Sequence, residues 1–100
     1  GEKMGLEELQ GKIFKALGHP IRVKIVKRLI EEEVCACKFI NDIEFSQSNL
    51  SQHLKILKEA GIVSSEKKGM NVIYSLANRE IAEIISKSEL VIKENMEKIK

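Results

Sequence analysis

Apolar residues recur at helical spacing along most of the chain, and the first two runs lie on either side of the single proline, Pro20. Apolar side chains three or four positions apart occur between residues 6 and 17 and again between residues 21 and 30. Proline suits the first position of a helix, and the glutamates at positions 31–33 are unfavourable at a helix C-terminus. The pattern predicts one helix before Pro20 and a second that ends near residue 31.

A short third helix, roughly Ala36 to Ile43, and a longer fourth helix are predicted next. Ser46 is a candidate N-cap for the fourth helix, and Gly61 is the residue type that ends a helix in the left-handed conformation. Between them runs a stripe of leucines four and three residues apart, Leu50, Leu54 and Leu57. The turn between the two helices is expected near Glu44 and Phe45.

The period of the pattern then changes from 3.6 to 2, which is typical of β-strands. Residues 62–67 and 72–76 form the two arms of a predicted β-hairpin, and residues 68–71 form its basic turn. From Asn78, a candidate cap, a long amphipathic helix is predicted to the end of the chain. The result is a mainly α chain with a β-hairpin wing (α+β), in the order ααααββα. This is the order of a winged helix-turn-helix with the fourth helix as recognition helix.

Composition narrows the class of protein. The 100 residues are 43% hydrophobic and 32% charged, which predicts one globular domain over residues 1–100. The sequence has no apolar run of membrane-spanning length and no signal-peptide pattern, so we expect a cytoplasmic protein without a membrane partner. Two histidines and one aspartate give no nucleophile and base set, which argues against an enzyme. The net charge of +2 is too small to indicate nucleic-acid binding by itself.

The polar face of the predicted fourth helix is rich in amides and contains no acidic residue between positions 46 and 58. The side chains left outside the leucine stripe are Gln47, Ser48, Asn49, Ser51, Gln52, His53, Lys55 and Lys58. Glutamine and asparagine can bind adenine with two hydrogen bonds, and serine, histidine and lysine can bind bases or phosphates. We expect this face to bind double-stranded operator DNA, with Lys67 and Lys68 of the hairpin on flanking phosphates. The alternative is a capped helix and a turn that are merely solvated.

The last helix carries an apolar stripe that a core of this size cannot wholly cover. Its members are Ile81, Ile85, Ile92, Met96 and Ile99. Together with Leu6, Leu9 and Ile13 of the first helix, this stripe predicts a homodimer interface. The alternative is that the stripe packs on its own domain.

Three segments of the chain resemble the ArsR/SmtB family of metal-responsive winged-helix repressors. Residues 14–22 (FKALGHPIR) are similar to the family's opening, residues 45–63 (FSQSNLSQHLKILKEAGIV) to its recognition segment, and residues 68–76 (KGMNVIYSL) to its wing. The resemblance covers about Leu6 to Ile99. It implies a homodimeric repressor that leaves its promoter when an inducer binds, and it implies DNA contacts from Gln47, Ser48, Ser51, Gln52 and His53.

Residues 33–37 (EVCAC) are similar to the family's metal box, in which a Cys-x-Cys pair binds soft ions such as arsenite, cadmium or lead. This chain departs from the family pattern because Cys35 and Cys37 are its only cysteines. The family's second site, on the C-terminal helices, is expected to be absent because no histidine follows His53.

Cys35 and Cys37 lie where the third helix is expected to start, which favours the thiolate form. Two ligands do not complete a zinc or arsenite site, so an ion would need donors from solvent, exogenous thiols or the second subunit. Three alternatives remain for the pair: a soft metal or metalloid sensor with no required cofactor, a thiol-redox sensor, and two buried side chains without a sensing role. We expect a sensor here to act through the short turn on the recognition helix. A non-sensing protein-interaction module is the remaining alternative function.

Overall fold

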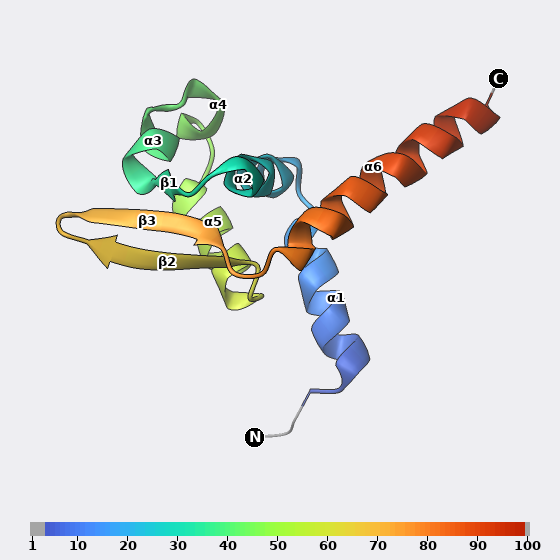
Figure 1. The fold of residues 1–100 in the computed structure, drawn as a ribbon, viewed down its shortest axis with the longest axis horizontal. Helices are drawn as coiled ribbons and strands as arrows, with labels where there is room; N and C mark the ends of the chain where they lie inside the picture. The colour runs from blue at the N-terminus through green and yellow to red at the C-terminus, as the bar shows by residue number, and fades with distance from the viewer. Residues whose placement is uncertain (1–3, 100) are drawn as a thin grey trace.

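The computed structural model describes residues 4–99, so residues 1–3 and 100 of the predicted domain lie outside the described residues. The elements, in chain order, are α1 (Leu6–Leu17), α2 (Pro20–Glu31), β1 (Val34–Cys35), α3 (Ala36–Asn41), α4 (Ile43–Ser46), α5 (Leu50–Glu59), β2 (Val63–Lys68), β3 (Asn71–Leu76) and α6 (Glu80–Lys98). The predicted class, helices with a β-hairpin wing, is confirmed (Figure 1). The helix start at Pro20 is confirmed as well.

Two short elements correct the predicted order. The third helix does not run to Ile43: it ends at Asn41, and Asp42 starts the separate helix α4 by accepting the Glu44 backbone N–H at 2.9 Å. The predicted turn at residues 44–45 is therefore helical. The two-residue strand β1 also stands between α2 and α3. Both elements are shorter than the stretch of sequence needed to recognise a hydrophobic period.

The wing belongs to a three-stranded antiparallel sheet in the order β1-β3-β2. A two-residue turn joins β2 to β3, and Gly69 has a φ of 64°, the left-handed value that such a turn requires at its first position. In the other direction β3 pairs with β1, with Val34 opposite Tyr74 and Cys35 opposite Ile73. The hairpin projects beyond the helices, as Figure 1 shows.

The core is centred on α2, whose Ile25 and Val26 have no exposed surface. Phe39 of α3 and Phe45 of α4 pack edge to face against each other, with ring centroids 5.3 Å apart. No polar or charged side chain is buried within residues 4–99. None of the helices in this described part is long and apolar enough to cross a membrane.

Helix α5 ends where the sequence predicts. Gly61 has a φ of 77°, and the Ile62 backbone N–H donates to the Leu57 carbonyl at 3.0 Å, which satisfies an otherwise unpaired carbonyl of the last turn. Asn78 also acts at the start of α6, where its Oδ1 accepts the Glu80 backbone N–H at 2.8 Å. These contacts set the path of the chain from α5 into β2 and from β3 into α6.

Candidate nucleic-acid interface and cysteine pair

The start of α5 differs from the prediction. Ser46 is the last residue of α4, and the N-cap of α5 is Asn49, whose side chain makes no capping hydrogen bond. The residues between them form a turn in which Ser48 Oγ donates to the Phe45 carbonyl at 2.7 Å. Short polar side chains that bond to nearby backbone favour such turns over helix interiors. Gln47, Ser48 and Asn49 therefore precede the recognition helix instead of lying on it.

Most of the predicted DNA-binding side chains at and before the start of α5 are nevertheless exposed, and we call this group the α5 face. It consists of Gln47, Asn49, Ser51, Gln52 and Lys55, all exposed, together with the half-buried Ser48. On the opposite side of α5, Leu54 and Leu57 enter the core. The α5 face thus offers amide, hydroxyl and ammonium groups and no carboxylate, which suits base edges and phosphates.

His53 is placed differently from the rest of this set. It is half-buried, its Nδ1 lies 3.2 Å from Nη1 of Arg22, and its ring centroid lies 4.5 Å from that of His19. An arginine can only donate hydrogen bonds, so Nδ1 of His53 accepts the bond from Arg22 and the proton of the neutral imidazole ring lies on Nε2. Partial burial, and then the charges of His19 and Arg22, hold the pKa of His53 below its ordinary value. Only Nε2 remains to meet DNA.

Arg22, which the sequence analysis did not single out, connects three helices. Its Nε donates to the Ala16 carbonyl at 2.6 Å and its Nη2 to the Lys15 carbonyl at 3.3 Å, which satisfies the C-terminal carbonyls of α1. Its third contact is His53 on α5. The partners lie six or more positions away in the sequence, so no local pattern could reveal the role.

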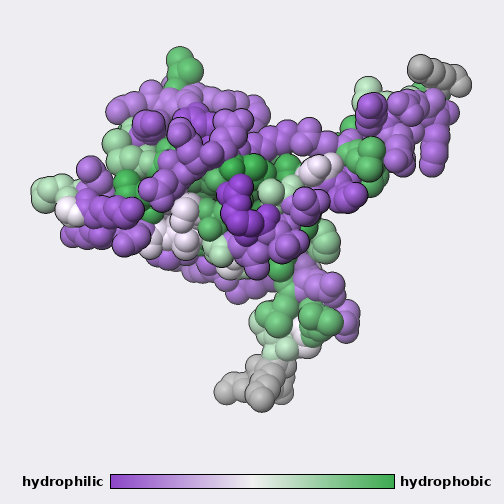
Figure 2. All heavy atoms as spheres, in the orientation of Figure 1, coloured by the Kyte–Doolittle hydropathy of each residue, from purple (hydrophilic) through white to green (hydrophobic). Residues whose placement is uncertain are grey.

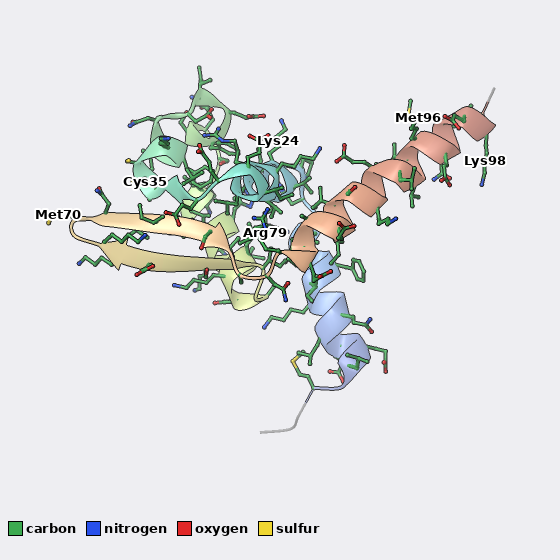
Figure 3. All side chains as sticks on the ribbon, in the orientation of Figure 1. Lys24, Cys35, Met70, Arg79, Met96 and Lys98 are labelled. Carbon is green, nitrogen blue, oxygen red and sulfur yellow. The ribbon has the colours of Figure 1, made fainter. Side chains whose placement is uncertain are left out.

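The two wing lysines differ in their surroundings. Both Lys67 and Lys68 are exposed, but the Lys68 Nζ lies 3.7 Å from Oε1 of Glu33, the residue before β1. Met70, 96% exposed, points away from the tip of the hairpin (Figure 3). The base of the wing is held to α5 by Lys58, whose Nζ donates to Ser65 Oγ at 2.7 Å. Lys67 and Lys68 thus lie on a projecting arm beside the α5 face.

The cysteines lie at the start of α3, as predicted. Cys35 is the N-cap, and its Sγ accepts the Cys37 backbone N–H at 3.4 Å and the Cys37 thiol at 2.7 Å. These two hydrogen bonds, with Lys38 nearby, lower the pKa of Cys35 below its ordinary value. The same thiol contact raises the pKa of Cys37. Cys35 is therefore the more acidic thiol of the pair, and Cys37 donates the hydrogen bond between them.

Donor number limits what the pair can bind. Across residues 4–99, no third histidine, cysteine, aspartate or glutamate lies close enough to form a metal-binding group with the pair. Thiolates are the ligand type that soft, thiophilic ions prefer. Two of them are too few to complete a site such as that of zinc, which takes four ligands. The exposed Cys37 and half-buried Cys35 leave room for further donors from outside this subunit.

The apolar stripe predicted for dimerisation divides in two along α6. Ile81 and Ile85 are buried in the core of the same chain, so the structure does not place them on an open surface. Ile92, Met96 and Ile99, farther along, are exposed. On α1, Leu6 and Leu9 are exposed and Ile13 is half-buried against the core. Figure 2 shows apolar surface on both of these projecting helices.

The structure adds two residues to this surface that the prediction lacked, Phe14 and Val91. Phe14 of α1 is 62% exposed, and a hollow of about 410 Å³ lies between it and Ile84 and Val91 of α6. Phe14 belongs to the same helical pattern as Leu6, Leu9 and Ile13, but nothing local distinguishes covered members from uncovered ones. We call Leu6, Leu9, Phe14, Val91, Ile92 and Met96 the terminal-helix surface.

Known proteins resemble the chain in sequence and in fold. A family model described as "Bacterial regulatory protein, arsR family" matches residues 19–65. The transcriptional repressor SmtB of Mycobacterium tuberculosis is 40% identical over 75 residues, which cover 75% of this chain and 56% of SmtB, so the chain spans little more than half of that relative. A cadmium resistance transcriptional regulatory protein CadC homolog of Staphylococcus aureus is 41% identical over 80 residues, covering 79% of this chain and 66% of the homolog.

An uncharacterized HTH-type transcriptional regulator of Mycobacterium tuberculosis, Rv0081, matches over nearly the whole chain. It is 35% identical over 92 residues, covering 91% of this chain and 81% of Rv0081. Its crystal structure gives a TM-score of 0.84 at 30% identity and covers 96% of this chain and 97% of that one. These relatives are transcriptional regulators and not enzymes. The chain belongs to the ArsR/SmtB family of winged helix-turn-helix transcriptional regulators.

Proposed function

We propose that the protein is a homodimeric, sequence-specific DNA-binding repressor that leaves its operator when an inducer reacts at Cys35 and Cys37. The observation that carries the DNA-binding part is the α5 face, an exposed surface of amides, hydroxyls and a lysine without a carboxylate. The naming of SmtB as a transcriptional repressor supports the same conclusion.

Each part of the interface has a distinct role in this proposal. Gln52 and the turn residues Gln47 and Asn49 read base edges in the major groove, because amides both donate and accept. Ser48, Ser51 and Lys55 bind phosphates, and Nε2 of His53 adds a donor. The wing lysines Lys67 and Lys68 bind phosphates beside the adjacent minor groove.

A second copy of the chain covers the terminal-helix surface in this proposal. Phe14, Val91, Ile92 and Met96 expose about half or more of their area, which is a large apolar surface for a chain of this size. A two-fold axis through this surface presents two α5 faces to one side of a duplex. The operator is then an inverted repeat with half-site centres about 34 Å apart.

We propose a soft metal or metalloid ion as the inducer, held by the thiolates of Cys35 and Cys37. The two sulfur donors select thiophilic ions over hard ones, and the cadmium-resistance name of the Staphylococcus aureus relative supports this class. The missing donors come from solvent, a small thiol or the second subunit. No resident cofactor is needed for DNA binding in this account.

Thiol oxidation is the second candidate, favoured by the 2.7 Å contact between the two sulfur atoms. In this reaction Cys35 and Cys37 lose two protons and two electrons to an oxidant and gain one S–S bond. A ring that spans only one intervening residue is strained, so such a disulfide would be easily reduced.

The experiment selects an operator from a random duplex library and measures its release by cadmium chloride and by diamide. The parent is compared with the Cys35→Ser, Cys37→Ser double variant. Release by cadmium that EDTA reverses supports the metal sensor, and release by diamide that dithiothreitol reverses supports the redox sensor. A double variant that binds DNA and is released as readily as the parent would remove the sensing role. A parent that binds no duplex would instead indicate a protein-interaction module.

A further inference from the structure

The cysteine pair is joined directly to the wing. Cys35 is a residue of β1 as well as the N-cap of α3, and in β1 it pairs with Ile73 of β3. Val34 pairs with Tyr74 in the same ladder. Any displacement of the Cys35 backbone therefore acts on the central strand of the sheet, whose other partner is β2.

A second contact joins the same segment to the far end of the hairpin. Glu33, two residues before Cys35, has its Oε1 3.7 Å from the Lys68 Nζ, and Lys68 pairs with Asn71 next to the turn. Figure 3 shows Cys35 above the hairpin, on the side of β3. Residues 33–35 thus contact the wing at the strand and again near its tip.

The α5 face is anchored by other residues. His53 of α5 is held by Arg22 of α2 at 3.2 Å, and Lys58 is held by Ser65 at 2.7 Å. Between the first turn of α3 and α5 lies a hollow of about 480 Å³, with Ala36 on one side and Ser51 on the other. A displacement of Cys35 therefore acts directly on its partner strand β3, whereas the hollow separates the first turn of α3 from α5.

We propose that β1 is the coupling element between the cysteine pair and DNA, so that a ligand on Cys35 and Cys37 lowers DNA affinity by displacing the wing lysines Lys67 and Lys68 while α5 keeps its place. A ligand draws the Cys35 Sγ away from the Cys37 N–H that it accepts, and this loosens the end of β1. Release requires only that the ligand bind the displaced form more tightly than the DNA-bound form. The inference rests on the proposed function and replaces the predicted route through the recognition helix.

The test is a cycle of variants, each compared with its own affinity for the selected operator before and after cadmium chloride is added. The variants are the parent, Lys67→Ala with Lys68→Ala, and Gln52→Ala as the matched control on α5. In the parent we expect cadmium to weaken binding by roughly 5- to 150-fold, the usual range of coupling between sites. The wing variant should show almost no further weakening, and Gln52→Ala should keep the parent's factor.

A second readout separates loss of the wing from a general loss of structure. Loading the parent with cadmium should make its salt dependence shallower by about 0.9 in log–log slope for each lost phosphate contact, hence by roughly 3.6 for two lysines in each of two subunits. The coupling through β1 is overturned if cadmium weakens DNA binding by the wing variant by more than half as much, on a logarithmic scale, as it weakens binding by the parent. It is also overturned if cadmium leaves the salt-dependence slope of the parent unchanged. A parent that cadmium does not release, or that binds no duplex, refutes the proposed function itself.

Discussion

Arg22→Ala should destabilise the protein far more than an ordinary surface substitution, because one side chain supplies three contacts between helices. The substitution removes the hydrogen bonds to the Ala16 and Lys15 carbonyls and to Nδ1 of His53. Hydrogen bonds from a charged donor contribute about 1.5–3 kcal/mol each when well buried. Two of these bonds are only part-buried and the third, at 3.3 Å, is exposed. We therefore expect a loss of about 2 kcal/mol in the free energy of unfolding.

Urea unfolding followed by circular dichroism, at one fixed subunit concentration, measures this loss. Arg79→Ala is the matched control, because the Arg79 guanidinium makes a single exposed hydrogen bond, to the Ile30 carbonyl at 2.9 Å. Arg22→Lys keeps the charge but not the forked donors, and should fall between the two. The His53 proton signal should also titrate at higher pH in Arg22→Ala. A loss of unfolding free energy smaller than about 0.5 kcal/mol would refute the reasoning, because ordinary surface substitutions change stability by up to that amount.

Three further predictions follow from the interface and the histidine pair. Ile92→Glu places a carboxylate on the terminal-helix surface and should give a monomer with weak operator affinity in sedimentation and binding assays; a surviving dimer would indicate another interface. Glu33→Gln removes the carboxylate that competes with DNA phosphate for Lys68, so it should tighten DNA binding a few-fold at low salt. Weaker binding would contradict a phosphate contact by Lys68. The depressed pKa of His53 means that the unfolded chain binds a proton more readily, so stability should fall as the pH drops below about 6.5. His53→Asn should remove this part of the pH dependence of the urea midpoint, and an unchanged dependence would show that other groups cause it.

Features that depend on neighbouring residues could be predicted from the sequence. Pro20 starts α2 because its ring and missing N–H suit that position, and Gly61 ends α5 because it adopts a positive φ without strain. The hairpin follows from period-two patterning around Gly69. In each case the deciding physics acts within a few residues.

Features that depend on residues far apart in the sequence could not be predicted from it. Strand β1 is two residues long and exists because Cys35 meets Ile73, far along the chain. Ile85 and Ile92 occupy the same amphipathic stripe, yet the first is buried and the second exposed, since the body of the protein reaches only the first turns of α6. The start of α5 at Asn49 instead of Ser46 depends on α4, which Asp42 initiates.

The most direct test of the central claim is the salt dependence of operator binding by the parent protein. Lys55, Lys67 and Lys68 from each of two subunits give six phosphate contacts, so log affinity against log salt concentration should have a slope of about −5. Lys98→Ala, which removes a lysine at the far end of α6 (Figure 3), should leave the slope unchanged. A slope near zero, or the same affinity for the selected operator and for unrelated duplex DNA, would contradict sequence-specific binding through the α5 face and the wing.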